Sequence, residues 1–127
     1  MFKVTRLTPV LQVEDVQKTV DYYRDILNFK VHMIWEDPET MEATFAAMQS
    51  NNFQIMFQKG KAHRQKEITY SDLYIHVENL RELAVHVRGK VGVISDLTTN
   101  PRGVEEFVIR DCNGYIITFS EVKGVNW

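Results

Sequence analysis

Apolar and polar residues alternate through the stretch 105–121, on both sides of the dipeptide Asn113-Gly114. Such alternation is typical of strands with one buried face, and Asn-Gly readily takes the positive φ angles of a tight turn. The stretch therefore predicts a β-hairpin. One face is apolar and aromatic and should cover a helix, while the other mixes polar residues with Val108 and Ile116 and is suited to line a wet cavity.

The first half of the chain carries the same kinds of pattern in the order strand, helix and three strands. An apolar run at 7–13 predicts a strand, and Asp15 follows it in the position that caps the start of a helix. Apolar residues then recur at helical spacing until Asn28, which tolerates the left-handed conformation that ends helices. Polar turns separate three further predicted strands, at residues 29–35, 42–48 and 53–57.

The second half repeats this order. Val13-Glu14-Asp15-Val16 in the first half matches Val77-Glu78-Asn79-Leu80 in the second. Asn79 is therefore placed to cap a second helix, which Gly89 should end. The flanking pattern predicts strands at 72–77 and 91–94, and a turn at 98–103 before the hairpin.

The polar stretch between the halves contains four basic residues around His63. Its composition favours a solvated connecting loop, with the binding of an anion as the alternative. The expected organisation is one domain, 1–127, with module 1 at about 4–58, a linker at about 59–68 and module 2 at about 69–121. We predict an α+β fold in which tandem β-α-β-β-β modules form a curved mixed sheet around a cavity, with the helices outside.

Composition narrows the classes of function. Of the 127 residues, 44% are hydrophobic and 25% charged, as in ordinary globular proteins, and the 15 basic and 17 acidic residues are too scattered for a nucleic-acid surface. No apolar run approaches the roughly 20 residues of a spanning helix, and the start lacks the apolar core of a signal peptide. We therefore expect a cytoplasmic protein that binds no membrane. Cys112, the single cysteine, has no second thiol for a disulfide or a zinc cluster.

The tandem arrangement resembles the vicinal oxygen chelate superfamily, which contains glyoxalase I, extradiol dioxygenases, fosfomycin-resistance enzymes and bleomycin-resistance proteins. The resemblance covers the whole chain and is most specific in two segments. The first has the aromatic pair Tyr22-Tyr23 and then Leu27-Asn28-Phe29, where the family commonly has Leu-Gly-Phe. The second, Asp111-Cys112-Asn113-Gly114-Tyr115, has Cys where the family commonly has Pro. Both replacements suit the turns concerned.

Enzymes of this family hold a divalent metal with four side chains, and the resemblance places these at Thr8, Gln54, Asp72 and Thr118. Strong sites of this type need imidazole or carboxylate donors, whereas this set has one carboxylate, one amide and two hydroxyls. We therefore expect no bound metal. The chain also lacks a glycine-rich phosphate loop and a Gly-x-Ser-x-Gly nucleophile turn, so no other cofactor is expected.

His76 is the histidine with a predicted place beside the cavity, because strand alternation puts it on the same face as Asp72. We expect a partly buried residue satisfied by its neighbours, with acid–base catalysis near neutral pH as the alternative. His32, His63 and His86 show no spacing that would make a metal pair.

Strand alternation also predicts the lining of the cavity. The lining combines apolar groups that supply contact area with amides, hydroxyls and one carboxylate that orient a ligand. Trp35 and Phe45 are included as stacking surfaces, although their short strands leave open whether they face the cavity or the core. The predicted ligand-binding residues are Thr8, Val10, Gln12, Trp35, Phe45, Asn52, Gln54, Met56, Asp72, Tyr74, His76, Val108 and Thr118.

A metal-free cavity of this composition favours a protein that binds a small organic molecule and sequesters it, as the family's bleomycin-resistance proteins do. The ligand could be a toxic natural product or a housekeeping compound. The alternative is a glyoxalase-like isomerase, lyase or dioxygenase, either metal-dependent or with Asp72 and His76 as an acid–base pair. A structural or protein-binding module is a third alternative, which a large exposed apolar surface would favour. Exposed strand edges predict a homodimer.

Overall fold

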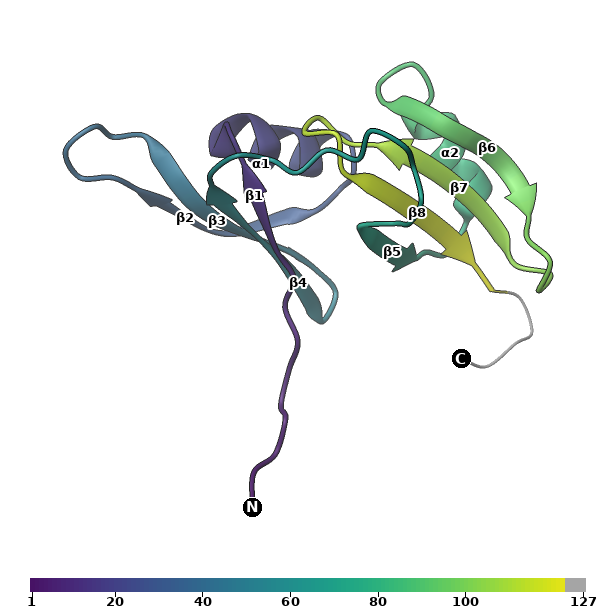
Figure 1. Ribbon diagram of the computed structural model, residues 1–127, viewed down its shortest axis with the longest axis horizontal. Helices are drawn as coiled ribbons and strands as arrows, with labels where there is room; N and C mark the ends of the chain where they lie inside the picture. The colour runs from purple at the N-terminus through teal and green to yellow at the C-terminus, as the bar shows by residue number, and fades with distance from the viewer. Residues whose placement is uncertain (123–127) are drawn as a thin grey trace. The chain divides into compact units, whose positions relative to one another are not determined.

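The structure is a computed structural model that describes residues 1–122. It contains two compact units, Met1–Ala62 and a second that begins at His63. Each unit has the order strand, helix and three strands (Figure 1). In unit 1 the elements are β1 (Val10–Val13), α1 (Val16–Asp25), β2 (Lys30–Glu36), β3 (Ala43–Ser50) and β4 (Phe53–Lys59). In unit 2 they are β5 (Leu73–His76), α2 (Leu80–Val87), β6 (Gly92–Thr99), β7 (Glu105–Arg110) and β8 (Ile116–Glu121).

The α+β class and the repeated β-α-β-β-β order are confirmed. Each unit has its own open, four-stranded sheet, in the orders β1-β4-β3-β2 and β5-β8-β7-β6. The first pair in each order is parallel and the other two pairs are antiparallel. The sheets are therefore mixed, as predicted, and β1 and β5, which each precede a helix, occupy equivalent outer positions.

The core of unit 1 forms where α1 packs on its sheet. Asp15 caps the helix as predicted, since its Oδ1 accepts a hydrogen bond from the amide of Lys18 at 3.0 Å. Tyr23 is fully buried, and its ring centroid lies 4.8 Å from that of Phe57 in β4. Asn28 has a φ of 62°, which reverses the chain after the helix and directs it into β2.

The start of α2 corrects one prediction, because the Asn79 side chain makes no capping hydrogen bond. Asn79 has a φ of 60°, and its backbone amide and that of Leu80 donate to the two carboxylate oxygens of Glu121 at 3.0 and 3.2 Å. A carboxylate from β8 therefore satisfies the free amides at this helix start and complements its positive end. Gly89, with a φ of 82°, lies just after the helix as predicted.

The predicted hairpin is formed by β7 and β8. Phe107 pairs with Phe119 and Ile109 with Ile117, and all four side chains are buried. The turn differs from the prediction in one respect, since of Asn113-Gly114 only Gly114 has a positive φ, of 91°. Asp111 accounts for this difference. Its Oδ1 accepts hydrogen bonds from the amides of Asn113 and Tyr115, both at 2.9 Å, and so holds the first part of the turn with negative φ angles.

Several strand boundaries also differ from the prediction, and three of them show the physical reasons or the size of the shift. β1 begins at Val10 rather than at Leu7, because Pro9 has no amide hydrogen with which to extend a ladder. β4 runs two residues further than predicted, to Lys59. β6 continues to Thr99 rather than ending at Ile94, because the polar residues after Ile94 are tolerated on an outer strand that has only one neighbour.

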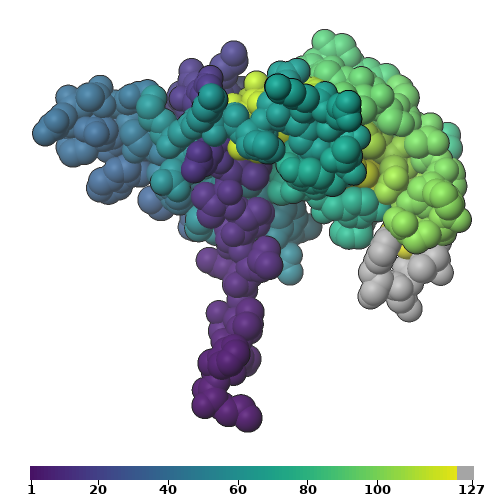
Figure 2. Space-filling model, viewed as in Figure 1, coloured from purple at the N-terminus to yellow at the C-terminus, as the bar shows by residue number. Residues whose placement is uncertain are grey.

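Residues 1–7 are all exposed and extend from unit 1 as an arm (Figures 1 and 2). Phe2, Val4 and Leu7 contribute apolar surface to this arm. Neither of the two helices in the described part of the chain has the length and apolar character needed to cross a membrane.

Candidate functional site

The sheet of unit 1 has one face covered by α1 and an opposite face, which we call open face 1. Phe57 belongs to the covered face because it contacts Tyr23. Residues on either side of it in β4 therefore point the other way. Val10 pairs with Met56 across β1 and β4, so the two share a face. Open face 1 thus carries four predicted residues, Val10, Gln12, Gln54 and Met56.

Trp35 and Phe45 also lie on open face 1, which resolves the facing that the sequence left open. They are direct cross-strand partners in β2 and β3, and Phe45 pairs in turn with Gln58 of β4. Direct partners share a face of the sheet. Trp35 is 56% exposed, so its indole is not a core residue. The strand register therefore extends this face across the whole sheet.

Thr8 and Asn52 lie outside the strands on which their prediction depended. Thr8 precedes β1, and Asn52 lies in the turn between β3 and β4 and is exposed. Strand alternation does not determine where their side chains point. That Thr8 and Asn52 line the same face therefore stays a prediction.

The sheet of unit 2 has an equivalent surface opposite α2, which we call open face 2. Arg81 of α2 contacts Glu105 at 3.1 Å, so Glu105 belongs to the covered face and Glu106 to the open face. Tyr74, Thr118 and Val108 form one row across β5, β8 and β7 on open face 2. His76, Ser120 and Glu106 form the next row.

A polar network spans open face 2. The Tyr74 hydroxyl donates to Glu106 Oε2 at 2.8 Å, and the Tyr74 ring lies edge-on to His76 at 5.3 Å. Because β8 lies between β5 and β7, the Tyr74 side chain must cross β8 to reach Glu106. The residues of β8 beneath it are correspondingly covered, with Ser120 0% and Thr118 5% exposed. The alternation in the sequence puts Glu106 on the same face as Val108, but no role was predicted for it.

His76 differs from the expectation of a partly buried residue, because it is exposed. Its Nδ1 lies 3.5 Å from Ser120 Oγ, a long contact, and its ring meets the Tyr74 ring. The side chains of Tyr74 and His76 are therefore held by their neighbours, while their outer surfaces stay accessible.

Asp72 is held within unit 2 by two internal hydrogen bonds. Its Oδ2 accepts from the amide of Ile116 at 2.8 Å and from Gln65 Nε2 at 3.3 Å. Gln65 is itself buried and also donates to the carbonyl of Tyr70 at 2.9 Å. The carboxylate thus ties the segment before β5 to the start of β8. This local role was missed because Gln65 lies in the polar linker, where no periodic pattern marks it.

The positions that correspond to the family's metal ligands do not fit a divalent ion. Asp72 already accepts two hydrogen bonds on one oxygen, and the buried Thr118 hydroxyl is hydrogen-bonded to Ser71. Thr8 and Gln54 offer only a hydroxyl and an amide, which are weak ligands for zinc or a transition metal. Among residues 1–122, moreover, His, Cys, Asp and Glu side chains form no group of three or more that could hold a metal.

Two carboxyl groups with a lowered pKa, those of Asp25 and Asp96, belong to surface ion pairs. A hydrogen bond from Arg24 lowers the pKa of Asp25, and a hydrogen bond from Arg88 lowers that of Asp96. Asp25 ends α1, and Arg88 follows α2. These shifts therefore do not mark an acid–base site on either open face.

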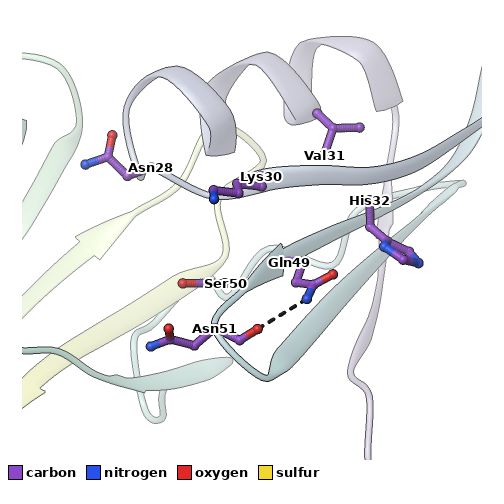
Figure 3. Close-up of a pocket in the computed structure, with 7 residues that line it drawn as sticks. All are labelled: Asn28, Lys30, Val31, His32, Gln49, Ser50 and Asn51. Atoms are coloured by element: carbon purple, nitrogen blue, oxygen red, sulfur yellow. Dashed lines mark hydrogen bonds between the residues drawn. The ribbon is translucent and has the colours of Figure 1, made fainter.

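Unit 1 also has a polar hollow of about 500 Å³ at the end of its sheet (Figure 3). Gln49 Nε2 donates to the carbonyl of Asn51 across it, at 3.2 Å. The hollow is lined by Asn28, Lys30, Val31, His32, Gln49, Ser50 and Asn51. None of these was a predicted ligand residue, although five of them lie in β2 and β3.

The two units, each with a helix on one face of a mixed sheet and a mixed apolar and polar surface on the other, define a paired β-α-β-β-β protein. The model of the Glyoxalase/Bleomycin resistance protein/Dioxygenase superfamily matches residues 5–119. The chain therefore belongs to this superfamily, as its motifs indicated. A comparison with curated proteins gives no match.

Solved structures of low sequence identity share the fold. A glyoxalase-related enzyme from Clostridium phytofermentans is 21% identical, with a TM-score of 0.82 over 96% of this chain and 98% of that one. TioX from Micromonospora sp. ML1 is 14% identical, with a TM-score of 0.74 over 93% and 98%. A bleomycin-binding protein from Streptomyces verticillus, solved with copper(II)-bleomycin, is 21% identical, with a TM-score of 0.69 over 97% and 100%.

Proposed function

We propose that this protein binds a small organic molecule on the open faces of its sheets and sequesters it without a metal. The observation that carries the proposal is the combination of aromatic, aliphatic and amide side chains on open face 1. There the exposed indole of Trp35 lies beside Phe45, in a sheet face that also bears aliphatic side chains and the amides of Gln12 and Gln54. Aromatic and aliphatic groups supply contact area, and amides orient a ligand through hydrogen bonds.

The comparison with the bleomycin-binding protein supports a small-molecule ligand, because that protein was solved with copper(II)-bleomycin on the same fold. At 21% identity it does not identify the ligand of this chain. The donor chemistry at Thr8, Gln54, Asp72 and Thr118 supports binding without a metal.

An isomerase, lyase or dioxygenase is the second candidate, and the likeness to a glyoxalase-related enzyme favours it. Its metal-independent form would use Asp72 and His76 as an acid–base pair. The internal hydrogen bonds of Asp72 argue against that role, because its carboxylate holds Ile116 and Gln65 in place. Sequestration needs affinity alone and is therefore the function we favour.

We also propose that the protein is a homodimer. β1 and β5 are outer strands with one neighbour each, and an outer strand leaves backbone donors and acceptors available for pairing. Light scattering at micromolar concentration should give twice the chain mass of 14.9 kDa. A mass of one chain would contradict this assembly.

Substitution of Trp35 tests where the ligand binds. For a compound found by thermal-shift screening, Trp35→Ala should weaken binding about tenfold, because a stacking aromatic surface is lost while the core stays intact. Val85→Ala is the matched control, since Val85 is an exposed apolar residue of α2. Isothermal titration would contradict the proposal if Trp35→Ala bound like the wild type, or if both variants lost affinity equally.

A further inference from the structure

Glu106 is a partly buried carboxylate that has no basic partner among residues 1–122. The neighbouring Glu105 faces the other side of the sheet and is paired with Arg81. Arg110 is the basic residue of β7 on open face 2, but it donates instead to the carbonyls of Gly114 and Gln65. It also lies four residues along the strand from Glu106, a distance of about 13 Å.

The Tyr74 hydroxyl holds one oxygen of this carboxylate and leaves the other available. Tyr74 donates to Oε2 at 2.8 Å, which fixes the position of the carboxylate on open face 2. The cross-strand partners of Glu106 are Thr98 and Ser120, both neutral. The carboxylate is therefore oriented by Tyr74 but not paired with a basic side chain among residues 1–122, so it can accept a charge-assisted hydrogen bond from a positive group of a ligand.

The ring of Tyr74 adds a second element for the same chemistry. Tyr74 is 39% exposed, so part of its aromatic surface is accessible. A tyrosine that donates its hydroxyl hydrogen to a carboxylate gains electron density in its ring, which strengthens the attraction of a cation to the ring face. His76 flanks this ring edge-on at 5.3 Å and holds its orientation.

We propose that Glu106 and Tyr74, flanked by His76, form a subsite that recognises a cationic nitrogen of the ligand, such as a protonated amine. The inference rests on the proposed binding function and names the chemical class of its ligand. The carboxylate supplies a charge-assisted hydrogen bond and the Tyr74 ring a cation–π contact. Neither Glu106 nor Tyr74 alone would identify such a subsite. The assignment rests on the hydrogen bond between them, which joins β5 to β7 across β8.

Three fragments of matched size test the subsite. Benzylamine, benzyl alcohol and benzoate are cationic, neutral and anionic at pH 7, and their binding can be followed through the backbone amide NMR shifts of Tyr74, His76 and Glu106. Benzylamine should bind about tenfold more tightly than benzyl alcohol, and benzoate should bind more weakly than either. In Glu106→Gln, whose amide oxygen can still accept the Tyr74 hydrogen bond, the preference for the amine should disappear.

Glu82→Gln is the matched control, because it removes the same charge from an exposed position on α2 and should leave the preference unchanged. Equal binding of the amine and the alcohol, or a preference that survives in Glu106→Gln, would overturn the inference while leaving the proposed function intact. The absence of shifts with all three fragments would also overturn it. The proposed function fails separately, if Trp35→Ala leaves the affinity of a screened compound unchanged.

Discussion

Gly114→Val should lower the free energy of unfolding by about 2 to 3 kcal/mol. Gly114 has a φ of 91°, a conformation that a β-branched residue adopts only under strain. A Cβ atom at this position would also lie 2.9 Å from Cγ of Arg64, closer than real Cβ contacts. Urea unfolding followed by circular dichroism gives the difference directly.

Gly103→Val separates the cost of backbone strain from the cost of the close approach to Arg64. Gly103 has a similar φ, of 83°, but a Cβ there would meet nothing within 4 Å. It should therefore cost about 1 to 2 kcal/mol, from backbone strain alone. When Arg64→Ala is added to Gly114→Val, the part of the stability loss that comes from the contact with Arg64 should be recovered. If Gly114→Val unfolded at the same urea concentration as the wild type, the turn would not have the conformation described.

Asp72→Ala should cost about 2 to 3 kcal/mol of folding free energy, because it leaves the buried amide of Ile116 unpaired and removes an acceptor from Gln65. Asp72 would then stabilise the fold rather than bind the ligand, whereas the sequence predicted it as a ligand-binding residue. Asp72→Asn keeps one oxygen acceptor and should cost about 1 kcal/mol.

Thr8→Ala is the matched control, since Thr8 is the position in unit 1 that the family resemblance pairs with Asp72 in the metal set. It should change stability by no more than about 0.5 kcal/mol. If Asp72→Ala unfolded like the wild type but lost ligand affinity, Asp72 would be a ligand-binding residue after all.

Local patterns were sufficient to predict most of the fold. Alternation gave the two faces of β7 and β8, and Phe107 and Phe119 are buried on the predicted apolar face. Helical spacing, together with Asp15 and Asn28, located α1 within a few residues. These features depend on neighbours close in the sequence, where periodicity and turn chemistry decide the structure.

Features that join distant residues could not be predicted in this way. The cap of α2 comes from Glu121, 42 residues from Asn79, and nothing near Asn79 points to it. The bond from Tyr74 to Glu106 spans 32 residues and depends on the strand order β5-β8-β7. Similarly, Trp35 could be assigned to open face 1 only once its partner, Phe45, was known.

Removal of metal tests the central claim most directly. Metal-stripped protein is titrated calorimetrically with a compound found by thermal-shift screening, once in EDTA and once with added zinc, nickel or manganese. The affinity and the melting temperature should be the same in both conditions, because the proposed binding surface uses aromatic groups, amides and the carboxylate of Glu106 rather than a metal. Binding that is lost in EDTA and restored by one equivalent of metal, or continuous heat from conversion of the compound, would contradict the account.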